Sequence, residues 1–261
     1  FKERFNRNPT EIRRHPVKGG APLRISLSYR PPFDFEGLLN FYRAHQVGKL
    51  ERFEEGKMRR VVLMGGKVGE IALSNDAENS CVIVEINFPE TSAIHALVSK
   101  VRSLLDLNSD PLLIANSLEL DPGIKSLLKK HPGIRLPSGW DGFEVAVATI
   151  LGQLVSVERG RALAADLIEM LGEDSGWIVE GEAIKLFPTP EHIAASDLRG
   201  LKTTSARKRA LISFAKAISQ RRLSLEPTQD VDAFLKKVLA IPGIGPWTAN
   251  YMALKVLRHA D

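Results

Sequence analysis

The strongest constraint on this chain is a Pro-Gly-Ile-Gly turn, residues 242–245, between two segments with helical periodicity. Before the turn, apolar residues recur at the spacing of one helix face; they are Val231, Phe234, Leu235, Val238 and Leu239. After the turn, Pro246 suits the first position of a second helix, which we expect to carry residues 248–254. The pattern therefore predicts two short helices joined by a tight glycine turn.

This turn has the features of a phosphate-binding device. Gly243 and Gly245 permit positive φ and let another backbone approach closely. The N–H groups at the start of the second helix, where Thr248 lies, add the positive end of the helix dipole. Such a hairpin would hold a nucleic-acid backbone in register without reading its base sequence.

Composition limits the class of protein. A chain of 261 residues with 44% hydrophobic content can bury a sizeable core and hold two lobes. It has no apolar run with a length of about 18 residues and no signal-peptide pattern, so we expect a cytoplasmic protein without membrane contact. The single Cys81 excludes an internal disulfide and a four-cysteine iron–sulfur cluster. The six histidines show no metal-ligand spacing, so the sequence assigns no metal ligand, and we expect no cofactor.

The positive charge is concentrated at the start of the chain. The net charge is +5, but residues 1–18 hold six basic and two acidic residues, a net +4, which leaves +1 for the other 243 residues. Any contact with DNA must therefore come from local geometry in a nearly neutral body. The basic run of Lys202, Arg207, Lys208 and Arg209 is typical of a solvated helix face, with phosphate contact as the alternative.

The chain predicts an α+β fold in two parts. Residues 20–111 alternate between strands and helices: a strand at 23–29, a helix at 35–45, a hairpin around Gly65-Gly66, a β run at 81–88 and an amphipathic helix at 92–107. Residues 112–261 are helical in pattern, with candidate helices at 111–118, 122–131, 142–151, 157–171, 190–195, 206–219 and 231–239. Residues 172–176 read as a turn.

The glycine turn and its helices resemble the helix-hairpin-helix motif of DNA glycosylases. Residues 243–251 are similar to the bacterial inducible type, DNA-3-methyladenine glycosylase II. Residues 148–156 resemble that family's strand-invading turn, 186–190 its central loop and 29–34 the opening of its N-terminal lobe, all in the family's order. The resemblance implies a mixed α/β lobe with an antiparallel sheet, followed by an all-helical helix-hairpin-helix domain. Residues 1–19 resemble the last helices of an AraC-type helix-turn-helix domain, with a basic linker as the alternative.

The resemblance assigns DNA-inserting roles to the turn at Gly152–Ser156. Leu154 corresponds to the wedge that fills the space left when a nucleotide rotates out of the duplex, and Gln153 would lie against the opened step. For a loop leucine without this resemblance, packing into the core is the ordinary interpretation.

The resemblance also implies an aromatic base pocket. Trp247 and Tyr251 are four residues apart and share a helix face, and Phe41 from the other lobe would join them. An electron-rich wall suits a base that alkylation has made cationic, because cation–π attraction then favours damaged over normal bases. Without the resemblance, Trp247 and Tyr251 would be assigned to interhelical packing.

The catalytic residue is not assigned from this sequence. In the related glycosylases that also cut the strand, the position of Trp247 holds a lysine that attacks the sugar, so tryptophan implies base excision without strand cleavage. The transition state needs a carboxylate near C1′, and the resemblance places that aspartate about six residues beyond Asp261. On this interpretation the 261 residues alone are inactive.

The sequence therefore predicts a monofunctional DNA glycosylase of base excision repair. It would excise alkylated purines similar to 3-methyladenine by base flipping and hydrolysis of the N-glycosidic bond. Its expected partner is double-stranded DNA containing alkylated bases, and we expect a monomer at the bacterial nucleoid. The alternatives are a non-catalytic DNA-binding or regulatory fragment, and a glycosylase of the same fold with another lesion preference.

Overall fold

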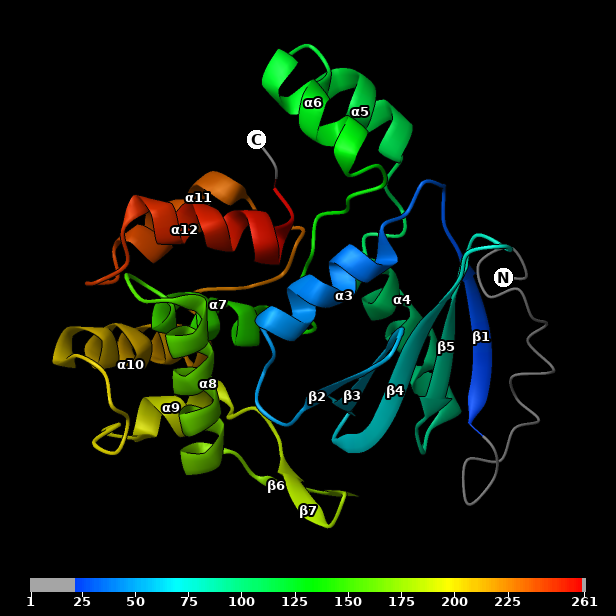
Figure 1. The fold of residues 1–261 in the computed structure, drawn as a ribbon. Helices are drawn as coiled ribbons and strands as arrows, with labels where there is room; N and C mark the ends of the chain where they lie inside the picture. Colours follow the sequence, from blue (N-terminus) through cyan, green and yellow to red (C-terminus); the bar gives the residue numbers. More distant parts are fainter. Residues whose placement is uncertain (1–21, 260–261) are drawn as a thin grey trace. The chain divides into compact units, whose positions relative to one another are not determined.

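The computed structural model describes residues 22–259, which form two compact units (Figure 1). Of the described residues, unit 1 comprises 22–44 together with Glu51–Pro137, and unit 2 comprises His45–Leu50 and 138–259. The chain thus passes between the units after Ala44, Leu50 and Pro137, and the expected domain boundary at residue 112 stays a prediction. The interpretations of residues 1–19 and of Asp261 lie outside the described residues.

Unit 1 is built on a five-stranded antiparallel sheet of order β1-β5-β4-β3-β2, shown in blue to teal in Figure 1. The strands are β1 (Leu23–Ser28), β2 (Glu51–Glu54), β3 (Lys57–Met64), β4 (Lys67–Asp76) and β5 (Cys81–Asn87). Gly65 and Gly66 have φ of 57° and 74°, and Met64 pairs with Lys67 across them. Two positive φ values match the twist of a two-residue hairpin, so the predicted Gly-Gly hairpin is confirmed.

Two helices complete the core of unit 1: α3 (Phe35–Ala44) and α4 (Ile94–Leu104), the latter preceded by the short 3₁₀ helix η1 (Thr91–Ala93). The predicted amphipathic helix at 92–107 is confirmed by the stripe of buried residues on α4: Ile94, Leu97, Val98, Val101 and Leu104. The Tyr42 hydroxyl donates to the Leu104 carbonyl at 2.5 Å, which ties the end of α3 to the end of α4. The helical hairpin of α5 (Pro111–Leu118) and α6 (Pro122–Lys130) follows, each helix capped by the aspartate before its proline.

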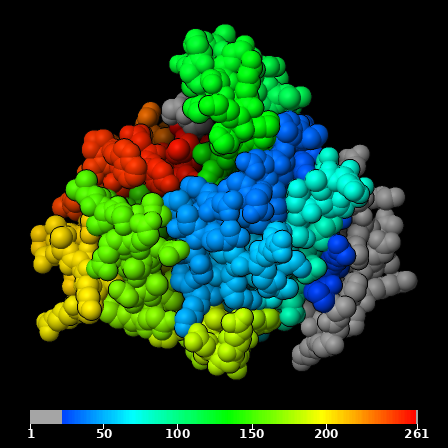
Figure 2. All heavy atoms as spheres, viewed as in Figure 1, coloured from blue at the N-terminus to red at the C-terminus, as the bar shows by residue number. Residues whose placement is uncertain are grey.

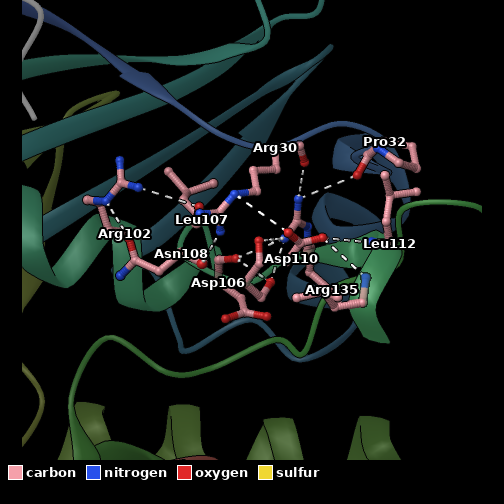
Figure 3. Close-up of polar contacts among 11 residues, drawn as sticks. Arg30, Pro32, Arg102, Asp106, Leu107, Asn108, Asp110, Leu112 and Arg135 are labelled. Carbon is pink, nitrogen blue, oxygen red and sulfur yellow. Dashed lines mark hydrogen bonds and ion pairs between the residues drawn. The ribbon is translucent and has the colours of Figure 1, made fainter. Parts of the chain in front are cut away.

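A buried arginine fastens the segment after α6 within unit 1. Arg135, after α6, is 5% exposed and its guanidinium lies over the Phe33 ring, 5.3 Å from the centroid. Figure 3 shows it between two loops, donating to the Ser109 carbonyl at 2.9 Å and to the Arg30 carbonyl at 2.5 Å. Burial lowers the pKa of Arg135 without discharging it. The segment after α6 is thus fastened to the loops that precede α3 and α5.

Unit 2 is mainly helical. Its elements are α7 (Gly142–Leu151), α8 (Val157–Leu171), the hairpin of β6 (Asp174–Val179) and β7 (Glu182–Lys185), α9 (Pro190–Ala195), α10 (Ser205–Ser219), α11 (Val231–Leu239), α12 (Pro246–Met252) and the π-helix η2 (Ala253–Leu257). Its core includes Phe143, Phe214 and Phe234, and the first two stack with centroids 6.1 Å apart. No described helix is long and apolar enough to cross a membrane.

The expected all-helical character of this part needs one correction. Residues 174–185 form a two-stranded hairpin, whereas we expected only a turn at residues 172–176 in this part of the chain. Its two-residue loop, Glu180-Gly181, has φ of 51° and 82°, the pattern of a tight β turn. The alternation of half-buried Trp177, exposed Ile178 and half-buried Val179 is the period of a strand, which glycine-rich surroundings obscure in the sequence.

Candidate nucleic-acid interface

The predicted helix-hairpin-helix is formed by α11, the turn at 240–245 and α12. Gly243 has φ of +92°, and a Cβ there would lie 3.1 Å from the Ala210 Cβ, so this position requires glycine for both conformation and space. Gly245 is different: its φ is −93° and its ψ 174°. The prediction of positive φ is therefore wrong at Gly245, because the residue before Pro246 is driven to extended backbone.

Gly245 nevertheless faces open space. A Cβ built on it meets no protein atom within 4 Å. The helix that follows has no side-chain cap at its start, whereas in α11 the Asp230 carboxylate accepts from the Ala233 N–H at 2.8 Å. The first N–H groups of α12 are thus aimed at a surface that lets a phosphate approach.

The turn after α7 projects a large apolar side chain into solvent. Leu154 is 103% exposed, and its backbone is left-handed with φ of +52°. For a residue other than glycine this conformation costs about 1–2 kcal/mol, so the surrounding contacts must hold it. The alternative that Leu154 packs into the core is wrong. Its exposure on a rigid turn is the geometry that a wedge requires.

Gln153 connects this turn to the hairpin. Its side-chain nitrogen donates to the Gly243 carbonyl at 3.1 Å and to the Thr248 hydroxyl at 2.9 Å. In Figure 2 the light-green part of the chain, which includes α7 and α8, lies next to the red part that includes α12, and the Gln153–Thr248 hydrogen bond joins the turn to the hairpin. The position that we expected for Gln153 against an opened base step stays a prediction. In the structure its side-chain nitrogen is bonded to acceptors of the protein itself.

Thr248 is 4% exposed. Because its hydroxyl accepts the Gln153 hydrogen bond, the side chain serves the junction between turn and hairpin. The group that Thr248 can offer to a phosphate is therefore its backbone N–H in the first turn of α12. Contact of Thr248, Gly243 and Gly245 with DNA stays a prediction.

The basic run before and in α10 is partly occupied by internal contacts. Arg207 donates to the Thr203 hydroxyl at 2.6 Å and to the carbonyl of Gln153. Lys208 donates to the Arg199 carbonyl at 3.2 Å. Lys202 and Arg209 are exposed. The run is thus divided between side chains that organise unit 2 and side chains in solvent.

Three residues form a stack along α12 and η2. The Trp247 and Tyr251 rings are nearly parallel, at 14°, with centroids 5.1 Å apart. The Lys255 ammonium lies over the Tyr251 ring, 5.9 Å from its centroid. Trp247 precedes Tyr251 by four residues and Lys255 follows it by four, so all three lie along one side of the helix. Trp247 is 68% exposed, so the open stacking surface is the outer face of its indole.

Lys255 is the residue of this stack that sequence reasoning missed. It is 8% exposed, and burial lowers its pKa to about 8, while burial raises the pKa of Tyr251. The π turn has a smaller rotation per residue than an α-helix, which keeps Lys255 in line with Tyr251. Its spacing of four residues from Tyr251 could have placed it on the same face from the sequence.

Phe41 lies on α3 in unit 1, half-buried, with its ring against Tyr42 at a centroid distance of 5.9 Å. Its predicted place beside Trp247 and Tyr251 stays a prediction. Among the described residues no group of three His, Cys, Asp or Glu side chains is placed to hold a metal ion. We assign no catalytic carboxylate to the described residues.

Comparisons with known proteins agree with this geometry. The family model of the AlkA N-terminal domain matches residues 24–141. The fold resembles that of the 3-methyladenine DNA glycosylase from Archaeoglobus fulgidus, with a TM-score of 0.76 and 20% identity over 91% of this chain and 80% of that one. It also resembles the Clostridium acetobutylicum 8-oxoguanine glycosylase/lyase solved with double-stranded DNA, with a TM-score of 0.67 and 18% identity over 91% of this chain and 77% of that one. These identities show the fold alone.

Sequence relatives are closer. The probable bifunctional transcriptional activator/DNA repair enzyme AlkA of Mycobacterium tuberculosis is 29% identical over 92% of this chain, which spans 48% of that relative. DNA-3-methyladenine glycosylase 2 of Escherichia coli is 31% identical over 90% of this chain and 82% of the relative. With that identity over most of both sequences, this chain belongs to the DNA-3-methyladenine glycosylase 2 family of helix-hairpin-helix DNA glycosylases.

Proposed function

We propose that this protein is a monofunctional DNA glycosylase that removes alkylated purines, 3-methyladenine among them, from double-stranded DNA. The observation that carries the proposal is Leu154, a fully exposed leucine in left-handed backbone on a turn hydrogen-bonded to the helix-hairpin-helix. A side chain so exposed contributes little to the core. It suits insertion between base pairs, where it replaces the stacking lost when a nucleotide is rotated out.

The parts act in a definite order. The hairpin around Gly243 and Gly245 binds a backbone phosphate through N–H groups, which sets the register without selecting sequence. Leu154 then enters the duplex at a fixed distance from that phosphate, because Gln153 bonds the turn to the hairpin. Register and insertion are thus set by one rigid element.

The extruded base meets the exposed indole of Trp247. Alkylation at a ring nitrogen makes a purine cationic, and cation–π attraction to tryptophan is worth about 1–2 kcal/mol when water is excluded. The same charge weakens the N-glycosidic bond, so modest selectivity in binding adds to intrinsic lability. The family resemblance aligns Trp247 with the nucleophilic lysine of strand-cleaving glycosylases, so water is the acceptor of the sugar in our proposal.

Release of base from N-methylated duplex DNA tests the proposal. The protein expressed from its complete gene should release 3-methyladenine, detected by chromatography, and leave abasic strands that break in hot alkali but not in neutral buffer. Undamaged duplex is the control, and borohydride should trap no protein–DNA adduct. Binding to abasic duplex without release of any base would overturn the proposal in favour of a non-catalytic DNA-binding protein. Release of a base together with a trapped adduct would refute the monofunctional mechanism.

A further inference from the structure

The turn that carries Leu154, here called the wedge turn, is also bonded to an arginine of α10, and its proposed function does not explain that contact. Arg207 lies in the first turns of α10, 54 residues along the chain from Gln153, and donates to the Gln153 carbonyl. Its other terminal nitrogen donates to the Thr203 hydroxyl at 2.6 Å. The planar guanidinium therefore bridges the loop before α10 and the peptide that leads into Leu154.

The Gln153–Leu154 peptide is the point where the turn becomes left-handed. Its carbonyl oxygen belongs to Gln153, and the next residue has φ of +52°. A charged donor on this carbonyl fixes the orientation of the peptide plane and thus the direction in which Leu154 leaves the turn. The Gln153 side chain is bonded at the same time to the hairpin, so the peptide is held from two elements.

We infer that Arg207 is a positioning residue, which holds Leu154 in its inserting conformation through the Gln153 carbonyl. The inference rests on the proposed wedge role of Leu154 and adds a residue of the basic run to it. Half-buried Arg207 uses both terminal nitrogens on protein acceptors, and this is why we assign it to the protein rather than to a phosphate. A positioning residue should act on DNA only when Leu154 is present.

A double-mutant cycle measures that dependence. The variants are Arg207→Met, Leu154→Ala and the two combined, with Arg209→Met as the matched control, because Arg209 is an exposed arginine of the same helix. The probe is a duplex with a tetrahydrofuran abasic site and 2-aminopurine beside it, whose fluorescence rises when insertion unstacks it. Measured at saturating protein, the signal reports insertion and requires no catalysis.

We expect Arg207→Met to lower the insertion equilibrium by about tenfold, within the range found for residues of one hydrogen-bonded network. In the Leu154→Ala background the same change should have no further effect. Arg209→Met should match the wild type at saturation. Arg207→Lys keeps the charge but cannot bridge both acceptors, so it should keep the salt dependence of binding and still lose insertion.

Three results would overturn the inference. The first is an equal loss of insertion for Arg207→Met with and without Leu154, and the second is an equal fluorescence signal for Arg207→Met and Arg209→Met. The third is full insertion by Arg207→Lys together with a shallower salt dependence of binding for Arg207→Met. The last outcome would identify a phosphate contact. If Arg207→Met fails to fold, the same cycle is run with Arg207→Lys: loss of insertion only when Leu154 is present supports the inference, and full insertion by Arg207→Lys overturns it. Failure of the proposed function is a separate result, because a wild type that inserts but releases no 3-methyladenine leaves the cycle measurable.

Discussion

Replacing Lys255 with methionine should stabilise the protein at neutral pH. Burial lowers the pKa of Lys255 from 10.5 to about 8, so the folded state holds this proton less well than the unfolded chain does. One pKa unit corresponds to about 1.4 kcal/mol, so keeping the buried ammonium charged costs about 3 kcal/mol of unfolding free energy at pH 7. Methionine fills a similar volume without a charge, and Lys255→Met should recover most of this cost.

The sign of the pH dependence follows from the same shift. Below about pH 8 both states are protonated and the full cost is present, and above about pH 10.5 both are neutral and it vanishes. The wild type should therefore gain stability relative to Lys255→Met across this window, and the difference should fall below about 1 kcal/mol at pH 10. Urea unfolding of both proteins at pH 7 and pH 10 measures it. Comparing the two at each pH cancels the groups they share.

Two controls separate charge from packing. Lys237→Met changes an exposed lysine of α11 and should leave the stability near that of the wild type at both pH values. Lys255→Arg keeps the buried charge and should gain nothing. A Lys255→Met protein that is less stable than wild type at pH 7, or a difference that does not shrink by pH 10, would refute the view that Lys255 is a desolvated cation.

The interface supplies three further predictions. Gly245→Val should leave the free energy of unfolding within about 0.5 kcal/mol of wild type, since a Cβ there meets no atom, but weaken binding to damaged and undamaged duplex alike. Gly243→Val should instead destabilise the fold. Equal duplex affinity of Gly245→Val and wild type would remove the hairpin from the interface. Leu154→Ala should also unfold at the wild-type temperature and should slow single-turnover excision, most at well-paired lesions. A loss of about 2–5 kcal/mol of unfolding free energy with unchanged excision would show that Leu154 is a core residue instead. Trp247→Ala should reduce the preference for cationic 3-methyladenine over neutral hypoxanthine by about tenfold in kcat/KM, and an unchanged preference would exclude cation–π selection.

The fold could be predicted from the sequence wherever periodicity and turn chemistry agreed. The hairpin at Gly65-Gly66 and helices such as α7 and α8 have the predicted bounds, because their buried faces and caps are local properties. The attachment of the segment after α6 was not predictable in this way. Arg135 bonds to Arg30, 105 residues away along the chain, and to Ser109, 26 residues away, and no local pattern reports such a bridge.

The candidate site shows the same limit at smaller scale. Leu154 was assigned from the family resemblance, and the glycines of the hairpin were assigned from the residue types of a tight turn. The hydrogen bonds that join them could not be predicted from the sequence. Gln153 is an ordinary polar loop residue in the sequence, and only the structure shows its amide bonded to Gly243, 90 residues away along the chain. Arg207 is likewise one basic residue of a run in the sequence, and only the structure shows its guanidinium donating to the Gln153 carbonyl before Leu154. In this protein the groups that we propose to contact DNA are assigned from residue type and from the family resemblance, and the groups that place them emerge from the packing of unit 2.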